Sequence, residues 1–324
     1  MKLLSKIFPI ILVYLILVIS GCSTYSPDPP KLIKATNTAA KAKYEIVEAN
    51  DLKVSSIQGL GFPGNDDSLY IATKSGIKMY KKGNWYQSTT NLHNYTGFQA
   101  IDEGYIASGH PQKGSGLKDP LGLVKSLDKG KSYSPITFHA EDAFRFFAAG
   151  NFSHVIYVLN EQPANQLNQG VYYTKDNGKT WGKSAFKGFA ADSLGMLAVH
   201  PSHGAIMAMS TRTGIYYSTD YGNSMKPVTS PVMVTALTFS GDTIIYSSVE
   251  NNAILFKKVN PKTGEQENIS IPFLNYDNPI TYVAVNPKNM KQLAFTTYQN
   301  DVFISNDSGK NWTTILAKGK KVPE

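Results

Sequence analysis

Two histidines and three acidic residues form the part of this sequence best suited to binding chemistry. His110 and Asp119 lie in one predicted loop, and His139, Glu141 and Asp142 lie in a later connection. Imidazole and carboxylate groups that meet can hold a divalent metal ion or a polar ligand. The structural alternative is that His110 fixes its loop, while Glu141 and Asp142 are solvated turn residues. We treat the five residues as a candidate ligand-binding set, with the metal unknown and no catalytic residue assigned.

A second constellation is an eight-residue pattern, the Asp octet, which occurs four times without gaps, at 126–133, 174–181, 218–225 and 305–312. Each octet begins with Ser or Thr, has Asp at its third position and Gly at its fifth, and ends on a bulky residue. The Gly permits a positive φ, and the carboxylate can accept backbone N–H groups across a turn. The defining residues are Asp128, Gly130, Asp176, Gly178, Trp181, Asp220, Gly222, Asp307, Gly309 and Trp312.

The octets punctuate a longer repeat. Successive octets lie about 45 residues apart, and the last interval spans two periods, with a degenerate copy near 244–264 and another before the first octet at 69–85. Each unit contains an apolar run, an alternating run, a strand that starts at Gly, an octet and a short final strand, which indicates four antiparallel strands. This period predicts an all-β fold, a β-propeller of six four-stranded blades. Seven blades are the alternative if 44–54 pairs with the tail, and a linear solenoid is the rival architecture.

Propeller topology places the candidate residues. If the strands of a blade are called A to D from the inside outwards, B-to-C loops and D-to-A links emerge on one face, and the octets turn on the other. The loop with His110 and Asp119 is B-to-C, and the segment with His139 is D-to-A, so we expect the candidate set to share one rim. His200 and His203 should lie on the opposite face as loop residues.

The start of the chain is typical of an export signal. Lys2 and Lys6 precede a thirteen-residue apolar run, 7–19, which is too short to span a bilayer as a helix. The residues up to Cys22, the only Cys in the chain, resemble a bacterial lipobox, which implies cleavage before Cys22 and diacylglycerol on its thiol. An ordinary secretory signal is the alternative.

The expected organisation is therefore a lipoprotein signal peptide at 1–21, a lipid-anchored flexible tether at 22–43 and the propeller at 44–324. The Ser-, Pro- and Lys-rich composition of the tether lacks any hydrophobic period. The expected location is the extracytoplasmic face of the cell membrane, with the membrane itself as a partner through Cys22.

The octets resemble Asp-box, or BNR, repeats. This resemblance implies a sialidase-like or sortilin-like propeller in which the octet aspartates are structural and peripheral. The second unit, with Ser108 to Pro111 before the first octet, looks like bacterial propeller lipoproteins that are often labelled glycosyl hydrolase-like. Fold alone does not give function.

Composition narrows the functions further. The chain carries 32 Lys and Arg against 24 Asp and Glu, but its only arginines are Arg145 and Arg212. The resemblance implies three arginines for a sialidase, so sialidase chemistry is disfavoured, and the lack of an Arg cluster argues against nucleic-acid binding. We expect a binding or assembly module without catalysis or cofactor, with a protein or glycan partner. The alternative is a glycoside hydrolase, not a sialidase, acting on an extracellular glycan through two carboxylates.

Overall fold

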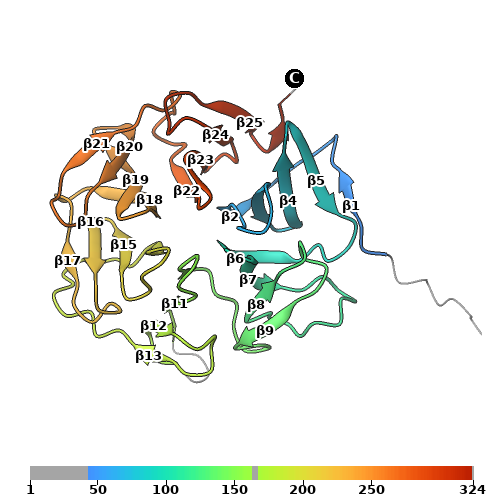
Figure 1. The fold of residues 1–324 in the computed structure, drawn as a ribbon, viewed down its shortest axis with the longest axis horizontal. Helices are drawn as coiled ribbons and strands as arrows, with labels where there is room; N and C mark the ends of the chain where they lie inside the picture. Colours follow the sequence, from blue (N-terminus) through green and yellow to red (C-terminus); the bar gives the residue numbers. More distant parts are fainter. Residues whose placement is uncertain (1–42, 163–166, 323–324) are drawn as a thin grey trace, which may run out of the picture. The chain divides into compact units, whose positions relative to one another are not determined.

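Six antiparallel sheets, arranged as blades around a common axis, make up the described chain (Figure 1). The computed structural model describes residues 43–162 and 167–322, so Cys22, the expected signal and nearly all of the expected tether lie outside the described residues. In that part of the chain no helix is long and apolar enough to cross a bilayer. The prediction of an all-β propeller with six blades is confirmed, and the solenoid alternative is wrong.

Each blade uses four consecutive strands, labelled A to D from the axis outwards. Blade 1 contains β2 (Ile57–Gly61), β3 (Leu69–Thr73), β4 (Gly76–Lys81) and β5 (Asn84–Ser88). Blade 2 contains β6 (Asn94–Ile101), β7 (Gly104–His110), β8 (Leu123–Ser126) and β9 (Ser134–Thr137). Blade 3 contains β10 (Phe147–Ala149), β11 (Ile156–Asn160), β12 (Gly170–Thr174) and β13 (Gly182–Lys183). Blade 4 contains β14 (Leu197–Val199), β15 (Met207–Thr211), β16 (Gly214–Ser218) and β17 (Lys226–Pro227). Blade 5 contains β18 (Met233–Ser240), β19 (Thr243–Glu250), β20 (Ala253–Val259) and β21 (Gln266–Asn268). Blade 6 contains β22 (Ile280–Asn286), β23 (Asn289–Thr297), β24 (Val302–Ser305) and β25 (Thr313–Ala317).

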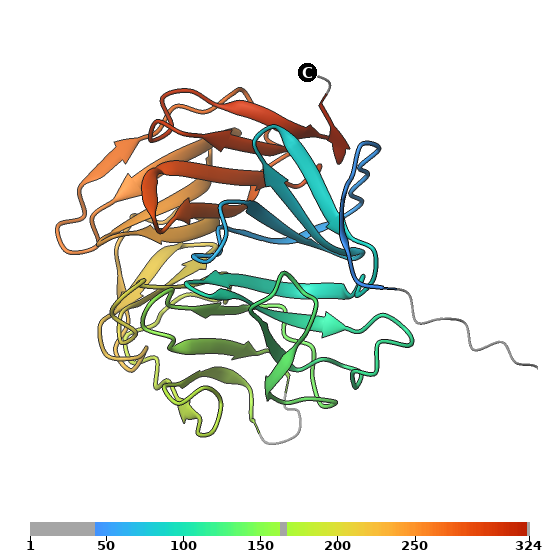
Figure 2. The ribbon, with the colours of Figure 1, turned by 45° about the vertical axis from the view of Figure 1, so that its right-hand side comes forward.

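Two short outer strands account for the segments that the seven-blade alternative used. β1 (Ile46–Glu48) pairs with β5 as a fifth strand of blade 1, and β26 (Lys320–Lys321) pairs with β25 as a fifth strand of blade 6. Figures 1 and 2 show β1 at the outer edge of its blade. The seven-blade alternative is therefore wrong, because the N-terminal segment and the tail extend two different blades and do not form one of their own.

The six gaps between neighbouring blades hold the core. Each gap contains one cluster of buried apolar side chains, supplied by the facing sides of two sheets. Alternating strand residues point to opposite faces, so both faces of every blade are covered by a neighbour. This explains why the strands are largely apolar on both sides and why most charged residues lie in turns and loops.

The ring closes at the seam between blades 6 and 1. Neither of these blades combines strands from the two ends of the chain. Trp85 of β5 is 1% exposed and donates its Nε1–H to the carbonyl of Ile315 in β25 at 3.1 Å. The N–H of Val54 donates to the carbonyl of Gly319 at 2.7 Å, and Lys53 forms a β-bridge with Lys320. Side-chain packing and these few hydrogen bonds hold the first blade to the last.

Candidate functional site

The four Asp octets occupy equivalent places, the C-to-D turn of blades 2, 3, 4 and 6. In the third blade, the first-position hydroxyl of Thr174 donates to Oδ1 of Asp176 at 2.8 Å and accepts the N–H of Gly178 at 3.0 Å. Thr180 donates its N–H to Oδ1 of Asp176 and its hydroxyl to Oδ2, at 2.9 and 2.6 Å. The other octets repeat the bonds of the first hydroxyl, and all four aspartates accept the N–H of the seventh residue. The octet aspartates thus act as turn acceptors.

These hydrogen bonds stabilise the charged form of the octet carboxylates. The hydroxyl and then the N–H of Thr180 lower the pKa of Asp176 to about 2, and the N–H and then the side chain of Asn311 lower the pKa of Asp307 to about 2. A carboxylate with a lowered pKa contributes stability above its unfolded pKa near 4, which is lost as the pH falls towards 2. The lowered pKa values of these aspartates reflect hydrogen bonds that stabilise the fold, and they do not mark a catalytic acid.

Two of the five candidate ligand-binding residues meet directly. Nδ1 of His110, at the end of β7, is 2.7 Å from Oδ1 of Asp119 in the following B-to-C loop, and both side chains are substantially exposed. This is an imidazole–carboxylate pair on the face that the topology predicts.

The other three candidate residues lie on the neighbouring D-to-A link, and two of them, His139 and Asp142, fasten it to the same loop. Nδ1 of His139 is 2.9 Å from the carbonyl of Leu121, and the carbonyl of Asp142 accepts the N–H of Gly122 at 3.0 Å. Glu141 is an exposed residue between them. The described residues contain no group of three or more His, Cys, Asp or Glu side chains that could hold a metal ion. A ligand role for this set stays a prediction.

A buried histidine anchors the loop that follows His110. His93 is 0% exposed, and its Nδ1 accepts the N–H of Gln112 at 2.9 Å. Its ring packs edge-on against Tyr95 and Tyr133, and its Nε2 is buried with no hydrogen-bond partner among the residues described. Burial lowers the pKa of His93 to about 4, because the charged imidazolium would lose its hydration there.

This burial predicts a pH dependence of stability. The folded chain keeps His93 neutral down to about pH 4, whereas the unfolded chain protonates it near 6.5, so the unfolded state binds more protons between these values. The free energy of unfolding should fall by about 3 kcal/mol as the pH is lowered from 6.5 to 4. Urea titrations across this range test the slope. In His93→Gln that part of the slope should disappear, while the octet contribution below about pH 4 persists; an unchanged slope in the variant would contradict the assignment.

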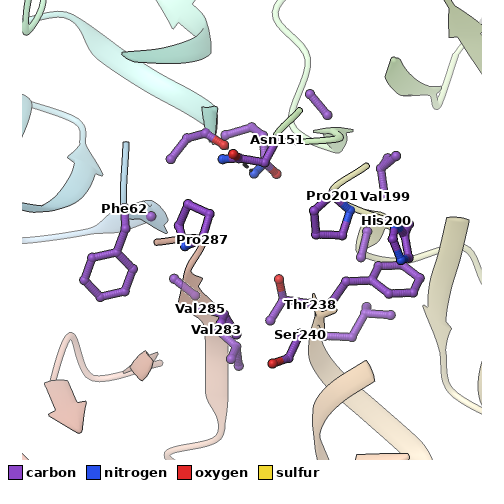
Figure 3. Close-up of a pocket in the computed structure, with 18 of the residues that line it drawn as sticks. Phe62, Asn151, Val199, His200, Pro201, Thr238, Ser240, Val283, Val285 and Pro287 are labelled. Carbon is purple, nitrogen blue, oxygen red and sulfur yellow. Dashed lines mark hydrogen bonds between the residues drawn. The ribbon is translucent and has the colours of Figure 1, made fainter. Parts of the chain in front are cut away.

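A cavity of about 260 Å³ lies on the axis of the ring (Figure 3). The A strands of all six blades line it, and so do the first residues of several A-to-B turns, which lie on the same face as the octets. Apolar side chains, including those of Phe62, Val199, Pro201, Val283 and Pro287, form much of the wall, and polar groups make up a similar share of its accessible surface. The candidate pocket therefore opens on the face opposite to the His110–Asp119 pair.

The polar groups of this axial pocket are almost all neutral. They are Gln99, Asn151, His200, Ser202, Thr238, Ser240 and Tyr282. Among the described residues that line the pocket, none is Asp, Glu, Lys or Arg. Oδ1 of Asn151 is buried and makes no hydrogen bond within the described chain. Such a surface suits an uncharged, partly apolar group that brings hydrogen-bond donors.

His200 forms a fixed part of the wall. Its side chain is 7% exposed, its Nε2 is 2.9 Å from Oδ1 of Asp242, and its Nδ1 accepts the N–H groups of Ser202 and His203. Because Nδ1 accepts, the proton resides on Nε2 and is donated to Asp242. This hydrogen bond is the main cause of the lowered pKa of Asp242. Both ring nitrogens are thus engaged within the protein.

The sequence predicts the correct face for His200, but no charged motif marks the axial pocket. The charged loop residues of the candidate set lie on the opposite rim. A signal was present, because the runs 196–201 and 282–287 share an apolar strand that ends in Pro, and both Pro201 and Pro287 line the pocket.

Comparison with known proteins places the chain among propellers. The family model described as sortilin, neurotensin receptor 3 (Sortilin-Vps10) matches residues 122–278, a little under half of the chain. No curated protein matches the sequence.

Solved structures share the fold at low identity. The GH74 enzyme of Niastella koreensis has a TM-score of 0.51 at 15% identity, covering 82% of this chain and 47% of its own. An ancestral GH74 enzyme has a TM-score of 0.54 at 13% identity, covering 85% of this chain and 40% of its own, so this chain spans less than half of either enzyme. A chain of the nidogen/laminin complex has a TM-score of 0.52 at 12% identity and is covered over 96% of its length.

Proposed function

We propose that this protein is a lipid-anchored binding module on the extracytoplasmic face of the cell membrane. It receives an uncharged, partly apolar segment of a partner protein in the axial pocket and performs no catalysis there. The similarity to the sortilin model and to the nidogen/laminin chain supports a propeller framework for this role but does not define the partner.

The observation that carries the proposal is the composition of the axial pocket. Six inner strands fix its wall, so the pocket is preformed and its residues lose little entropy on binding. Apolar side chains surround a few neutral donors and acceptors, such as Gln99 and Thr238. A partner with an apolar tip would gain burial of that tip and hydrogen bonds to these groups.

The alternative is a glycoside hydrolase, and the two GH74 structures give it a fold-level precedent. Hydrolysis of a glycosidic bond normally needs two carboxyl groups about 5 to 9.5 Å apart across the sugar. The described lining of the axial pocket supplies none, and Asp242, which bonds the wall residue His200, is itself 72% exposed. A binding role therefore fits the pocket better.

Filling the pocket tests the proposal. Thr238→Phe adds a ring to the pocket wall, while Thr313→Phe adds the same atoms to the exposed outer strand β25. In cross-linking and co-purification of the full chain from cells, we expect the partner to be lost at least tenfold with Thr238→Phe and kept with Thr313→Phe. Circular dichroism melts check that both variants fold. Equal capture by both variants, or turnover of a glycan by the wild-type chain that Thr238→Phe abolishes, would overturn the proposal.

The proposed anchor has its own test. Cys22→Ala removes the thiol that the lipid would modify, so the variant should move from the membrane to the soluble fraction and should not incorporate an alkyne-labelled palmitate. Lipid attachment through several buried acyl chains is strong, at about 0.8 kcal/mol per CH₂, so this shift should be nearly complete. A variant that remains fully membrane-bound would exclude lipidation of Cys22 as the anchor.

A further inference from the structure

A second concave surface adjoins the axial pocket, a groove of about 860 Å³ between blades 5 and 6. The groove and the pocket share Ser240, Gly241 and Met290. The groove continues outwards over the end of β21, the two residues after it and the octet of blade 6. A chain seated in the pocket can therefore extend into the groove without leaving the surface.

The groove carries an excess of positive charge, in contrast to the pocket. Lys288, Lys291 and Lys310 line its blade 6 side, and all three are exposed. No ion pair engages any of them within the described chain. On the blade 5 side, Lys258 is neutralised by Glu267, with Nζ 2.7 Å from Oε2.

The one further acid of the groove is also engaged. Asp242 is bonded to His200, and its pKa is lowered chiefly by that bond and then by the charge of Lys262. The bond to His200 leaves Asp242 charged, so the groove carries four lysines against two acids, and the three lysines of its blade 6 wall form no ion pair among the described residues.

The remaining lining favours a peptide over a polysaccharide. Ile269 and Met290 offer apolar contacts between the lysines, and Met290 is 57% exposed. No aromatic side chain is among the described residues of the groove, whereas sugar rings are commonly held against aromatic faces. Lysine is a point charge that pairs with single carboxylates, as aspartate and glutamate side chains present them.

We propose that the groove between blades 5 and 6 binds an extended acidic peptide segment of the partner, in which acidic and apolar residues alternate. The acidic residues lie against Lys288, Lys291 and Lys310, and the apolar residues lie against Ile269 and Met290. That one partner fills both the groove and the axial pocket rests on the proposed function. Binding of an acidic peptide to the groove can be measured independently of it.

A fluorescein-labelled twelve-residue peptide of repeating Glu-Val-Asp-Leu is the probe, and the same peptide with Gln and Asn is its neutral control. Fluorescence anisotropy with the full chain should show binding of the acidic peptide only, weakening as salt rises from 0.05 to 0.5 M and screens the charges. Charge reversal of the groove, Lys288→Glu with Lys291→Glu and Lys310→Glu, should weaken binding at least tenfold. The matched control reverses Lys131, Lys179 and Lys187, exposed lysines of blades 2 and 3, and should change affinity less than twofold.

Several outcomes would overturn the groove assignment: no binding of the acidic peptide, equal binding of the neutral peptide, or equal weakening by the control variant. A sulfated oligosaccharide that displaces the peptide at lower concentration than unlabelled peptide would assign the groove to polysaccharide instead. Thr238→Phe separates the two proposals, because it should leave peptide binding to the groove within twofold of wild type. If the groove test fails but Thr238→Phe still loses the partner, the groove proposal is wrong and the pocket proposal stands.

Discussion

Replacement of Trp85 by Ala should reduce the free energy of unfolding by about 3 to 5 kcal/mol, the usual cost of deleting a large buried aromatic side chain. Trp85 is 1% exposed, packs on Tyr80 with ring centroids 5.1 Å apart, and bonds the carbonyl of Ile315 across the seam between blades 1 and 6. The variant would lose this packing and leave that carbonyl without its donor. Urea unfolding followed by circular dichroism measures the loss.

A pair of conservative variants separates the hydrogen bond from the packing. Trp85→Phe keeps most of the apolar contact but removes the bond to Ile315, so it should cost about 1 to 3 kcal/mol beyond the volume change. Trp181→Phe is the matched control, because the Nε1–H of Trp181 is buried without a partner in the described chain. Removing an unsatisfied donor should cost little or even stabilise. If the two Phe variants lose the same stability, the seam hydrogen bond has no special role.

Gly309→Ala should be the most damaging single-methyl change in an octet, at about 2 to 4 kcal/mol. Gly309 has φ +86°, where a side chain is strained, and an added Cβ would overlap Cγ2 of Ile269 from the neighbouring blade. The conformational strain is about 1 kcal/mol or more, and overpacking adds about 1 to 3.

Gly264 provides the control for this prediction. It lies in the C-to-D turn of blade 5, the degenerate copy, with φ +77° and open space around its Cα. Gly264→Ala carries the strain without the overlap, so it should cost about 1 kcal/mol. Thermal melts of both variants give the difference. Equal destabilisation would show that the octet glycine is needed for its backbone conformation alone and not for contact between blades.

The sequence predicts the blades well because each strand and turn is a local pattern repeated six times. The expected degenerate copies are present: 69–73 is β3, and 261–264 forms the C-to-D turn of blade 5. The ring closure was harder to predict, since a three-residue strand such as β1 carries no periodic signal. Its pairing depends on the free edge of β5, which only the assembled blade presents.

The axial pocket could not be derived from residue chemistry, because its wall contains no cluster of charged side chains. It arises where six inner strands converge, so residues such as Thr238 and Val199 become neighbours only through closure of the ring. The candidate set behaved in the opposite way. His110 and Asp119 are close in sequence and paired in space, while His139 is occupied by the carbonyl of Leu121. Local constellations were visible from the sequence, and the shared cavity was not.

The outer position of β1 decides how tension on the N-terminal side of the chain would reach the ring. A pull at Lys43 acts first on the bond from the Thr89 hydroxyl to the Lys43 carbonyl and on the bond from the Tyr44 hydroxyl to the Lys129 carbonyl of blade 2. It then acts on β1, whose three residues pair with β5 at the outer edge of blade 1. Such an edge strand unzips bond by bond under load. We therefore expect a load on the N-terminal side to detach β1 from β5 while the hydrogen bond of Trp85 across the seam stays intact.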